Sequence, residues 1–194
     1  RLVKRFGLDP SPVTTQIEPH DSLAESYHII SRINSILIDF TQDMWQYISR
    51  SILGQKKISG ETGSSTMPHK INPIYFENAE GNCGLSNAVL YHLASKLTVS
   101  RMQRDLSGST VVRNQGVALG HSFIGLNSVI KGVDRITINQ ENMSIELDRH
   151  WEVLAEAVQT IMRKNGIQSA YDKLKNLTRG NYLDREKIHK LISD

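Results

Sequence analysis

The sequence predicts a mainly α protein, in which a bundle of long helices is followed by a small all-α domain. All five prolines lie at or before Pro73, so the rest of the chain is free of the residue that most strongly interrupts a helix. Apolar residues recur at steps of three and four over long stretches, which is the spacing of one helix face. No stretch of useful length alternates with the period of a strand, apart from a possible link at Arg135–Ile138.

The N-terminal part predicts a connection followed by a very long helix. Three prolines within residues 1–20 favour a short basic helix end and then an extended segment. Asp21 is a plausible N-cap for a helix that runs to about Leu53. Such a helix would span about 48 Å, too long for one small compact domain, so we expect it to pack in a long bundle. Its apolar positions are Ile30, Ile33, Leu37, Phe40, Met44 and Tyr47.

Two further long helices are predicted, from Pro73 to about Leu97 and from Ser109 to about Val133, with a polar connection at 98–108 between them. The third helix has the apolar positions Val112, Leu119, Phe123, Leu126, Ile130 and Val133. It also contains the small residues Gly116, Ala118, Gly120 and Gly125. Since each glycine costs a helix about 1 kcal/mol, we interpret them as sites where helices approach closely.

Beyond residue 134 the helices become shorter, and the pattern predicts them at about 140–149, 152–165, 169–178 and 184–193. We therefore expect two domains, at 1–134 and 135–194. The chain begins at Arg1 in sequence typical of a helix interior. We interpret it as the central domain of a longer protein, without its N-terminal part, followed by part of a C-terminal domain.

The composition excludes several classes of protein. Of 194 residues, 39% are hydrophobic and 22% charged, with no run of about 18 apolar residues and no charged-then-apolar leader, so we expect a cytoplasmic protein without a membrane partner. Cys83 is the single cysteine, and no Cys/His cluster has zinc spacing, so no metal is expected. The net charge of +3 is spread along the chain, which argues against nucleic acid and favours a small anionic substrate.

The stretch Gly63–Pro73 reads Gly-Ser-Ser-Thr-Met-Pro-His-Lys-Ile-Asn-Pro and is the strongest functional signal in the sequence. It combines the hydroxyls of Ser64 and Ser65, the charge of Lys70 and a helix start at the final Asn-Pro. This composition predicts a catalytic loop that is mobile when no substrate is bound. On composition alone an inert polar connection remains an alternative.

Three segments, Thr14–Asp21, Gly63–Asn82 and Gln103–Arg113, resemble the adenylosuccinate lyase family of the fumarase/aspartase superfamily. The resemblance extends over nearly the whole chain. It implies a homotetramer with a long-helix bundle of the fumarase/aspartase type, active sites built from three subunits, and no cofactor. The apolar seams of the three long helices also exceed what one subunit's core can use, which independently favours assembly.

The family's reaction is the β-elimination of fumarate from adenylosuccinate, giving AMP, and from succinylaminoimidazole carboxamide ribotide (SAICAR), giving aminoimidazole carboxamide ribotide (AICAR). Such a reaction needs a base, stabilisation of a carbanion, and an acid for the leaving nitrogen. The resemblance implies that Ser64 is the base, that Lys70 holds the succinyl carboxylate and that Asn72 binds substrate. Ser65 remains a competing base. The family's general-acid histidine would lie upstream of Arg1, so we expect this chain alone to be inactive.

The resemblance also assigns Gln16 to substrate binding and Glu77 to a glutamate that is paired with a catalytic histidine. A glutamate favoured by the helix dipole in a first turn is an equally good interpretation of Glu77. We expect His20 and His69 to be structural or substrate-orienting residues that transfer no proton.

The spacing of Arg104, Ser109 and Arg113 predicts a phosphate seat. Ser109 and Arg113 are four residues apart at an expected helix start, so they share a face beside free backbone N–H groups. Arg104 can add a bidentate contact from the preceding connection. Surface arginines in salt bridges are the ordinary alternative, but all three residues match substrate-binding positions of the family. Gly108 stands where the family pattern leads us to expect an acidic residue before that serine.

Two alternative functions stay open at this point. One is another lyase of the superfamily that acts on a different succinyl-type substrate. The other is a non-catalytic helical scaffold that retains the signature stretch.

Overall fold

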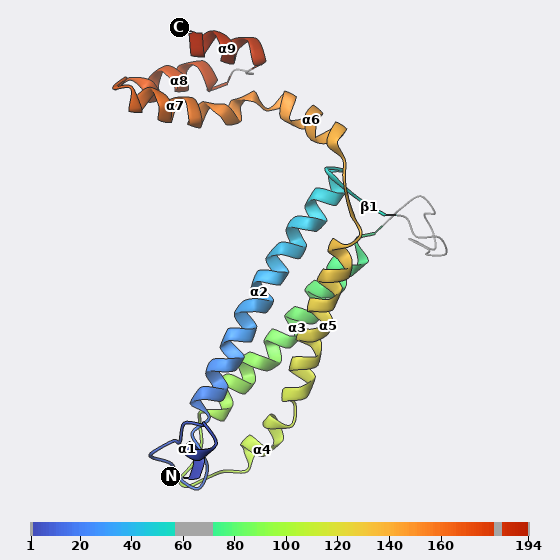
Figure 1. Ribbon diagram of the computed structural model, residues 1–194, viewed down its shortest axis with the longest axis vertical. Coiled ribbons are helices and arrows are strands. Elements are labelled where there is room, and N and C mark those ends of the chain that lie inside the picture. Colours follow the sequence, from blue (N-terminus) through green and yellow to red (C-terminus); the bar gives the residue numbers. More distant parts are fainter. Residues whose placement is uncertain (1, 57–71, 181–183, 194) are drawn as a thin grey trace. The chain divides into compact units, whose positions relative to one another are not determined.

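The computed structural model describes residues 2–56, 72–180 and 184–193, and its described part is mainly helical (Figure 1). The helices and strands follow one another as α1 (Leu2–Arg5), α2 (Asp21–Ser49), β1 (Leu53–Gln55), α3 (Ile74–Leu97), α4 (Ser107–Val112), α5 (Gln115–Val133), β2 (Ile136–Ile138), α6 (Gln140–Arg149), the 3-10 helix η1 (Trp151–Leu154), α7 (Ala155–Lys164), α8 (Ala170–Thr178) and α9 (Arg185–Ser193).

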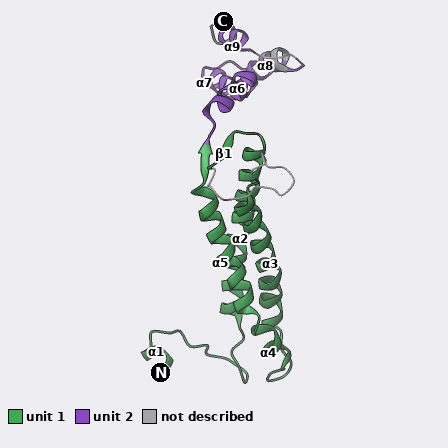
Figure 2. Ribbon diagram, turned by 90° about the vertical axis from the view of Figure 1, so that its right-hand side faces the viewer, with its two compact units in different colours: residues 1–137 green, residues 138–194 purple. Residues whose placement is uncertain are grey.

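A three-helix bundle of α2, α3 and α5 forms most of the first compact unit, residues 1–137 (Figures 1 and 2). Helix α3 packs against both other helices and supplies most of the fully buried side chains. One cluster of the core lies where α2, α3 and α5 meet, and it consists of Ala24, Tyr27, Leu90, Leu93, Ala94, Leu97 and Ala118. The sequence prediction of a bundle of long helices is confirmed.

Close approach of α3 and α5 depends on two glycines. A Cβ atom added to Gly125 would lie 2.5 Å from Sγ of Cys83, and one added to Gly132 would lie 2.9 Å from the ring of Phe76. Real Cβ atoms almost never approach so closely, so a larger residue at either position would force its neighbour to shift. The prediction of close packing is right for Gly125, whereas a Cβ atom added to Gly116 or Gly120 would meet no other atom within 4 Å.

Polar side chains cross-link the three long helices inside the bundle. The Asn34 amide nitrogen donates to Ser86 Oγ and to Asn87 Oδ1, both at 3.0 Å. Ser122 Oγ donates to Asn34 Oδ1 at 2.7 Å, and Ser86 Oγ donates to the carbonyl of Ala118 at 2.8 Å. Because a buried polar group is costly without partners, this network favours one register of α2 against α3 and α5.

The apolar positions predicted for the third helix mostly face outwards in the single chain. On α5, Leu119, Phe123, Leu126, Ile130 and Val133 are exposed, and the buried residues of that helix are Ala118, Gly125, Ser128, Val129 and Gly132. On α2, the predicted Ile33 and Tyr47 are likewise exposed. Helix periodicity was therefore a correct guide to the helices, but on α5 it did not mark the face that packs within one chain.

The start of α2 also differs from the prediction. Asp21 is the first helical residue, and the N-cap is His20, with a left-handed backbone at φ 62° and no capping bond from its side chain. A contact between the His20 ring and the Glu18 carboxylate accompanies this conformation. Left-handed backbone is uncommon outside glycine, and at His20 it turns the chain from the connection into helix α2.

Two short elements, β1 and α4, were missed. Helix α2 ends at Ser49, and β1 follows it and pairs with β2, where a possible extended link was expected. The predicted connection 98–108 already contains the start of α4, and the expected third helix is interrupted between α4 and α5. Elements of three to six residues carry too few positions for a periodic pattern to be recognised.

The second compact unit, residues 138–194, contains α6, η1 and α7–α9 (Figure 2). Its buried apolar side chains among the described residues include Ala170, Leu174 and Ile188. The division falls after Thr137, a few residues beyond the boundary expected after residue 134. No helix in the described ranges is both long and apolar enough to cross a membrane.

Candidate active site

The signature stretch lies largely outside the described residues. Ser64, Ser65, His69 and Lys70 all belong to the segment 57–71, so the structure gives no position for the expected base or for the expected lysine. The description resumes at Asn72, which is half-buried and immediately precedes the buried Pro73 and helix α3. The carbonyl of Pro73 accepts the first backbone hydrogen bonds of that helix, from Phe76 and Glu77.

Glu77 lies in the first turn of α3 and contacts a residue that the sequence did not single out. Its Oε1 accepts a hydrogen bond from the Trp45 indole nitrogen at 3.2 Å. The two residues line an open hollow of about 380 Å³ together with Gln42, Gln46 and Glu80. The partner comes from α2, 32 positions earlier, so local sequence pattern gave no sign of it.

Arg104 and Ser109, two of the three residues predicted to form the phosphate seat, meet in the structure. Arg104 Nη2 donates to Ser109 Oγ at 3.3 Å. Arg113 follows Ser109 by four residues, and its backbone continues the right-handed turn of α4, so the two lie on neighbouring parts of one helical face. The backbone N–H of Ser109 is not free, because it donates to the carbonyl of Leu106 at 3.1 Å. The expectation of a free backbone N–H is therefore wrong for Ser109.

Gln16 lies beside this seat. Its backbone N–H donates to the carbonyl of Gln103 at 3.3 Å, so the N-terminal segment adjoins the turn that carries Arg104. Two of the three segments that show the family resemblance thus meet at one end of the bundle, although 87 positions separate Gln16 from Gln103.

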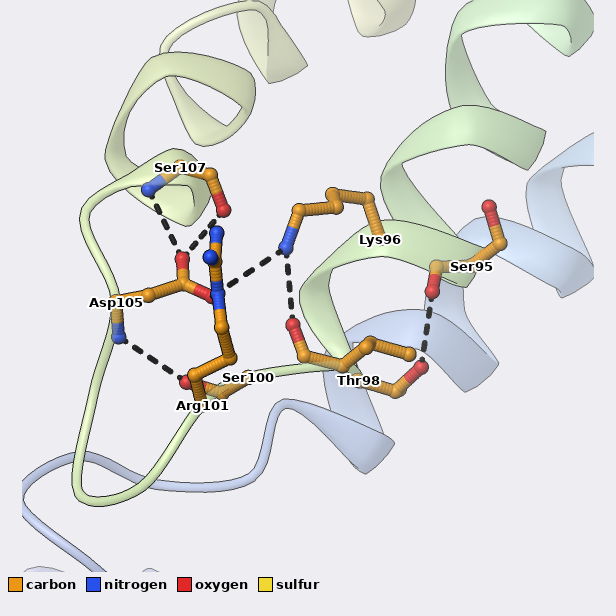
Figure 3. A network of polar contacts seen from close by, with 8 residues as sticks. Ser95, Lys96, Thr98, Ser100, Arg101, Asp105 and Ser107 are labelled. Atoms are coloured by element: carbon orange, nitrogen blue, oxygen red, sulfur yellow. Dashed lines mark hydrogen bonds and ion pairs between the residues drawn. The ribbon is translucent and has the colours of Figure 1, made fainter.

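The turn between α3 and α4 is centred on Asp105, which the sequence did not mark as a site residue (Figure 3). Its carboxylate accepts hydrogen bonds from the Ser107 backbone N–H at 2.9 Å and from the Ser107 hydroxyl. Arg101 Nε lies 3.4 Å and Lys96 Nζ 4.0 Å from its other oxygen. The Ser107 hydroxyl, followed by the Ser107 N–H, Arg101 and Lys96, lowers the pKa of Asp105 to about 2.

The site residues that the structure describes fall into two groups at opposite ends of α3. Asn72 and Glu77 lie at its start, whereas Arg104, Ser109 and Gln16 lie past its end (Figure 1). A helix of 24 residues is about 36 Å long at about 1.5 Å per residue. This length far exceeds a nucleotide, so one copy of the bundle cannot place both groups on the same small substrate.

No group of three or more His, Cys, Asp or Glu side chains suited to a metal occurs among the residues that the structure describes. The chemistry available at the two groups is that of hydroxyls, amides, guanidinium groups and one carboxylate.

Comparison with known proteins identifies the family. The family model described as "Lyase" matches residues 2–85, and the model described as "Adenylosuccinate lyase C-terminal" matches residues 100–194. This chain belongs to the adenylosuccinate lyase family. The signature stretch and Gln16 lie in the part of the chain that the first model matches, and the Arg104–Arg113 segment lies in the part that the second model matches.

Close relatives within the family come from bacteria. The chain is 56% identical over 191 residues to the adenylosuccinate lyase of Escherichia coli strain K12, and 57% identical over 191 residues to that of Legionella pneumophila strain Corby. The enzyme of Vibrio cholerae is 52% identical over the same length. In each case 98% of this chain is aligned, and it spans 42% of the relative's length.

Proposed function

We propose that this chain is part of an adenylosuccinate lyase, an enzyme that eliminates fumarate from adenylosuccinate to give AMP and from SAICAR to give AICAR. The observation that carries the proposal is the Arg104–Ser109 contact, in a segment matched by the adenylosuccinate lyase C-terminal model. Both substrates are ribotides and carry a phosphate. A guanidinium and a hydroxyl held together, with Arg113 one turn further, can bind such a phosphate through charge-assisted hydrogen bonds.

The bond cleavage itself is assigned to the signature stretch. Ser64 would remove the proton from the carbon next to a succinyl carboxylate, and Lys70 would offset the negative charge that develops on that carboxylate. Asn72 would help to hold the succinyl group. The C–N bond then breaks, the electron pair goes to the nitrogen of the nucleotide, and an acid supplies a proton there. We assign that acid to a histidine outside this chain.

Glu77 is assigned to the orientation of that histidine. A carboxylate that accepts a hydrogen bond from a histidine ring fixes its tautomer and favours its charged form. Trp45 supports this role, because its indole N–H holds one carboxylate oxygen at 3.2 Å.

We also propose a homotetramer with active sites shared between subunits. The two groups of site residues are separated by the length of α3, so a complete site requires groups from more than one copy of the bundle. The exposed apolar face of α5, with Phe123 at 67% exposure, supplies a surface that assembly would cover. A cytoplasmic location completes the proposal, since the single thiol of the chain suits a reducing compartment.

The proposal is tested on the full-length protein that contains this chain. Purified protein is supplied with adenylosuccinate or SAICAR, and the release of fumarate is measured; AMP and fumarate are then titrated separately and together by calorimetry. We expect turnover of both substrates and binding of AMP. Binding of fumarate without AMP would indicate another lyase of the superfamily, and binding of neither product would indicate a non-catalytic scaffold.

A further inference from the structure

We propose that Asp105 is the positioning residue of the phosphate seat: it fixes the turn between α3 and α4 so that Arg104 and Ser109 are presented together to the substrate's phosphate. This inference rests on the proposed function and adds to it a residue that touches no substrate atom.

The first support is that apolar burial does not hold this turn. Every described residue from 98 to 106 is exposed except Asp105, and the two largest apolar side chains, Met102 and Leu106, are 89% and 74% exposed. Met102 also has a left-handed backbone at φ 50°, a conformation that surrounding contacts must maintain. A segment without buried apolar contacts samples many conformations unless polar contacts restrain it.

The second support is that Asp105 supplies those polar contacts on both sides of the turn, towards α3 and towards α4 (Figure 3). Towards α4, its carboxylate accepts hydrogen bonds from the backbone N–H and the hydroxyl of Ser107, the first residue of that helix. Towards α3, it approaches Arg101 Nε and Lys96 Nζ, and its own N–H donates to Ser100 Oγ at 3.2 Å. One carboxylate thereby ties the end of α3, the turn and the start of α4 to one another.

The third support is the position of the seat within these restraints. Arg104 directly precedes Asp105, and Ser109 lies in the turn of α4 that Asp105 anchors. The 3.3 Å contact between Arg104 and Ser109 requires the turn and the helix start to keep their relative orientation. When the turn is already ordered before binding, less conformational entropy is lost as the phosphate binds. Loss of Asp105 should therefore weaken phosphate binding although every side chain that contacts the phosphate is still present.

The test compares Asp105→Ala with the wild type in the full-length enzyme. We expect the dissociation constant of AMP and the KM of adenylosuccinate to rise by about three- to tenfold, the effect of about one hydrogen bond, with kcat nearly unchanged. Adenosine, which lacks the phosphate, should bind both proteins equally. In an Arg104→Ala, Ser109→Ala background, Asp105→Ala should add almost nothing, because its effect passes through those two side chains.

Asp184→Ala is the matched control. Asp184 also accepts a hydrogen bond from a backbone N–H at the start of a helix, that of Lys187 at 2.9 Å, but it belongs to the second unit. We expect it to leave AMP and adenosine binding unchanged. If Asp105→Ala does not fold, Asp105→Asn and Ser107→Ala provide the same comparison, with an expected rise for AMP of about two- to threefold.

Two results would overturn the inference while leaving the proposed function intact. One is unchanged AMP affinity in folded Asp105 variants of an active enzyme, and the other is an equal loss of AMP and adenosine binding. A wild-type protein that neither binds AMP nor cleaves adenylosuccinate would instead overturn the proposed function, and this inference with it.

Discussion

Ser64 and Arg113 are expected to serve different steps of the reaction, so their substitution should change different kinetic parameters. Ser64→Ala in the full-length enzyme should remove nearly all turnover and leave substrate affinity close to normal, because it deletes a group needed only in the transition state. Single-turnover kinetics and calorimetry measure the two quantities separately. Ser65→Ala is the matched control and should stay active; the reverse pattern would transfer the role of base to Ser65.

Arg113→Ala should act on binding. Loss of one charge-assisted contact to phosphate is expected to weaken AMP binding by about 1.5–3 kcal/mol. Arg149, an arginine in the last turn of α6, provides a control substitution that should leave AMP binding as it is. An unchanged AMP affinity in Arg113→Ala would remove this arginine from the seat.

Protonation of Asp105 should not affect AMP binding over the pH range in which the enzyme works. The pKa of Asp105 is lowered to about 2, so the favourable contacts of the carboxylate with Ser107, Arg101 and Lys96 are lost only as the pH falls towards that value. They are fully present above the ordinary aspartate pKa of about 3.9.

The AMP affinities of the wild type and Asp105→Asn should therefore run parallel between about pH 5 and about pH 8, since titration of the AMP phosphate near pKa 6 affects both proteins equally. Calorimetry over this range checks the expectation. A loss of affinity on acidification that occurs in the wild type alone would show that Asp105 titrates at a higher pH.

At the scale of helices, the same substitution at two glycines of α5 should change the stability of the bundle in opposite directions. Gly125→Ala forces a methyl group against Cys83 Sγ, and such overpacking costs about 1–3 kcal/mol, only partly offset by about 1 kcal/mol of helix propensity. Gly120→Ala places its methyl group in open space and should stabilise by about 0.5–1 kcal/mol. Thermal unfolding of both variants measures the difference; equal effects would show that α5 can shift to accept the methyl group.

The helices were predictable to the extent that a periodic pattern could develop in them. Helix α3 begins and ends within a residue of its predicted bounds, because it starts after Pro73 and runs for many turns. Strand β1 has three residues, too few for an alternation to be seen, whereas β2 lies within the link expected at Arg135–Ile138. The buried face of α5 was mispredicted because the residues that this helix places inside the bundle are mostly small, such as Ala118, Gly125 and Gly132, while its larger apolar residues are exposed.

The site residues were predictable where the chemistry is local. Arg104 and Ser109 are only five positions apart, and the structure brings their side chains together. Their binding of a phosphate stays a prediction. Trp45 was missed because it reaches Glu77 from another helix. Asp105 was missed because an aspartate in a polar connection looks ordinary until the contacts around it are known.

For the whole molecule, the separation of the two site groups along α3 predicts that inactive variants can complement each other. Ser64→Ala subunits keep an intact phosphate seat, and Arg113→Ala subunits keep an intact signature stretch. When equal amounts of the two are unfolded and reassembled together, random mixing in shared sites should leave about a quarter of the sites with both parts intact. Fumarate release by the mixture measures the recovery, and each variant reassembled alone is the control.

Activity that stays at the level of the separate variants would argue against shared sites. Light scattering on the same samples should give the mass of a homotetramer. A stable, non-aggregating monomer at micromolar concentration would contradict the assembly and leave the exposed face of α5 without a function.

Cys83 makes the separation of α3 from α5 measurable by thiol chemistry. Its side chain is fully buried beside Gly125, and burial raises the pKa of the thiol, so the reactive thiolate is both rare and inaccessible in the folded bundle. A thiol reagent can therefore modify this chain only after the two helices part, and the labelling rate reports the free energy of that opening. Followed at increasing AMP concentration, this rate would tell whether a ligand held at one end of the bundle makes its middle harder to open.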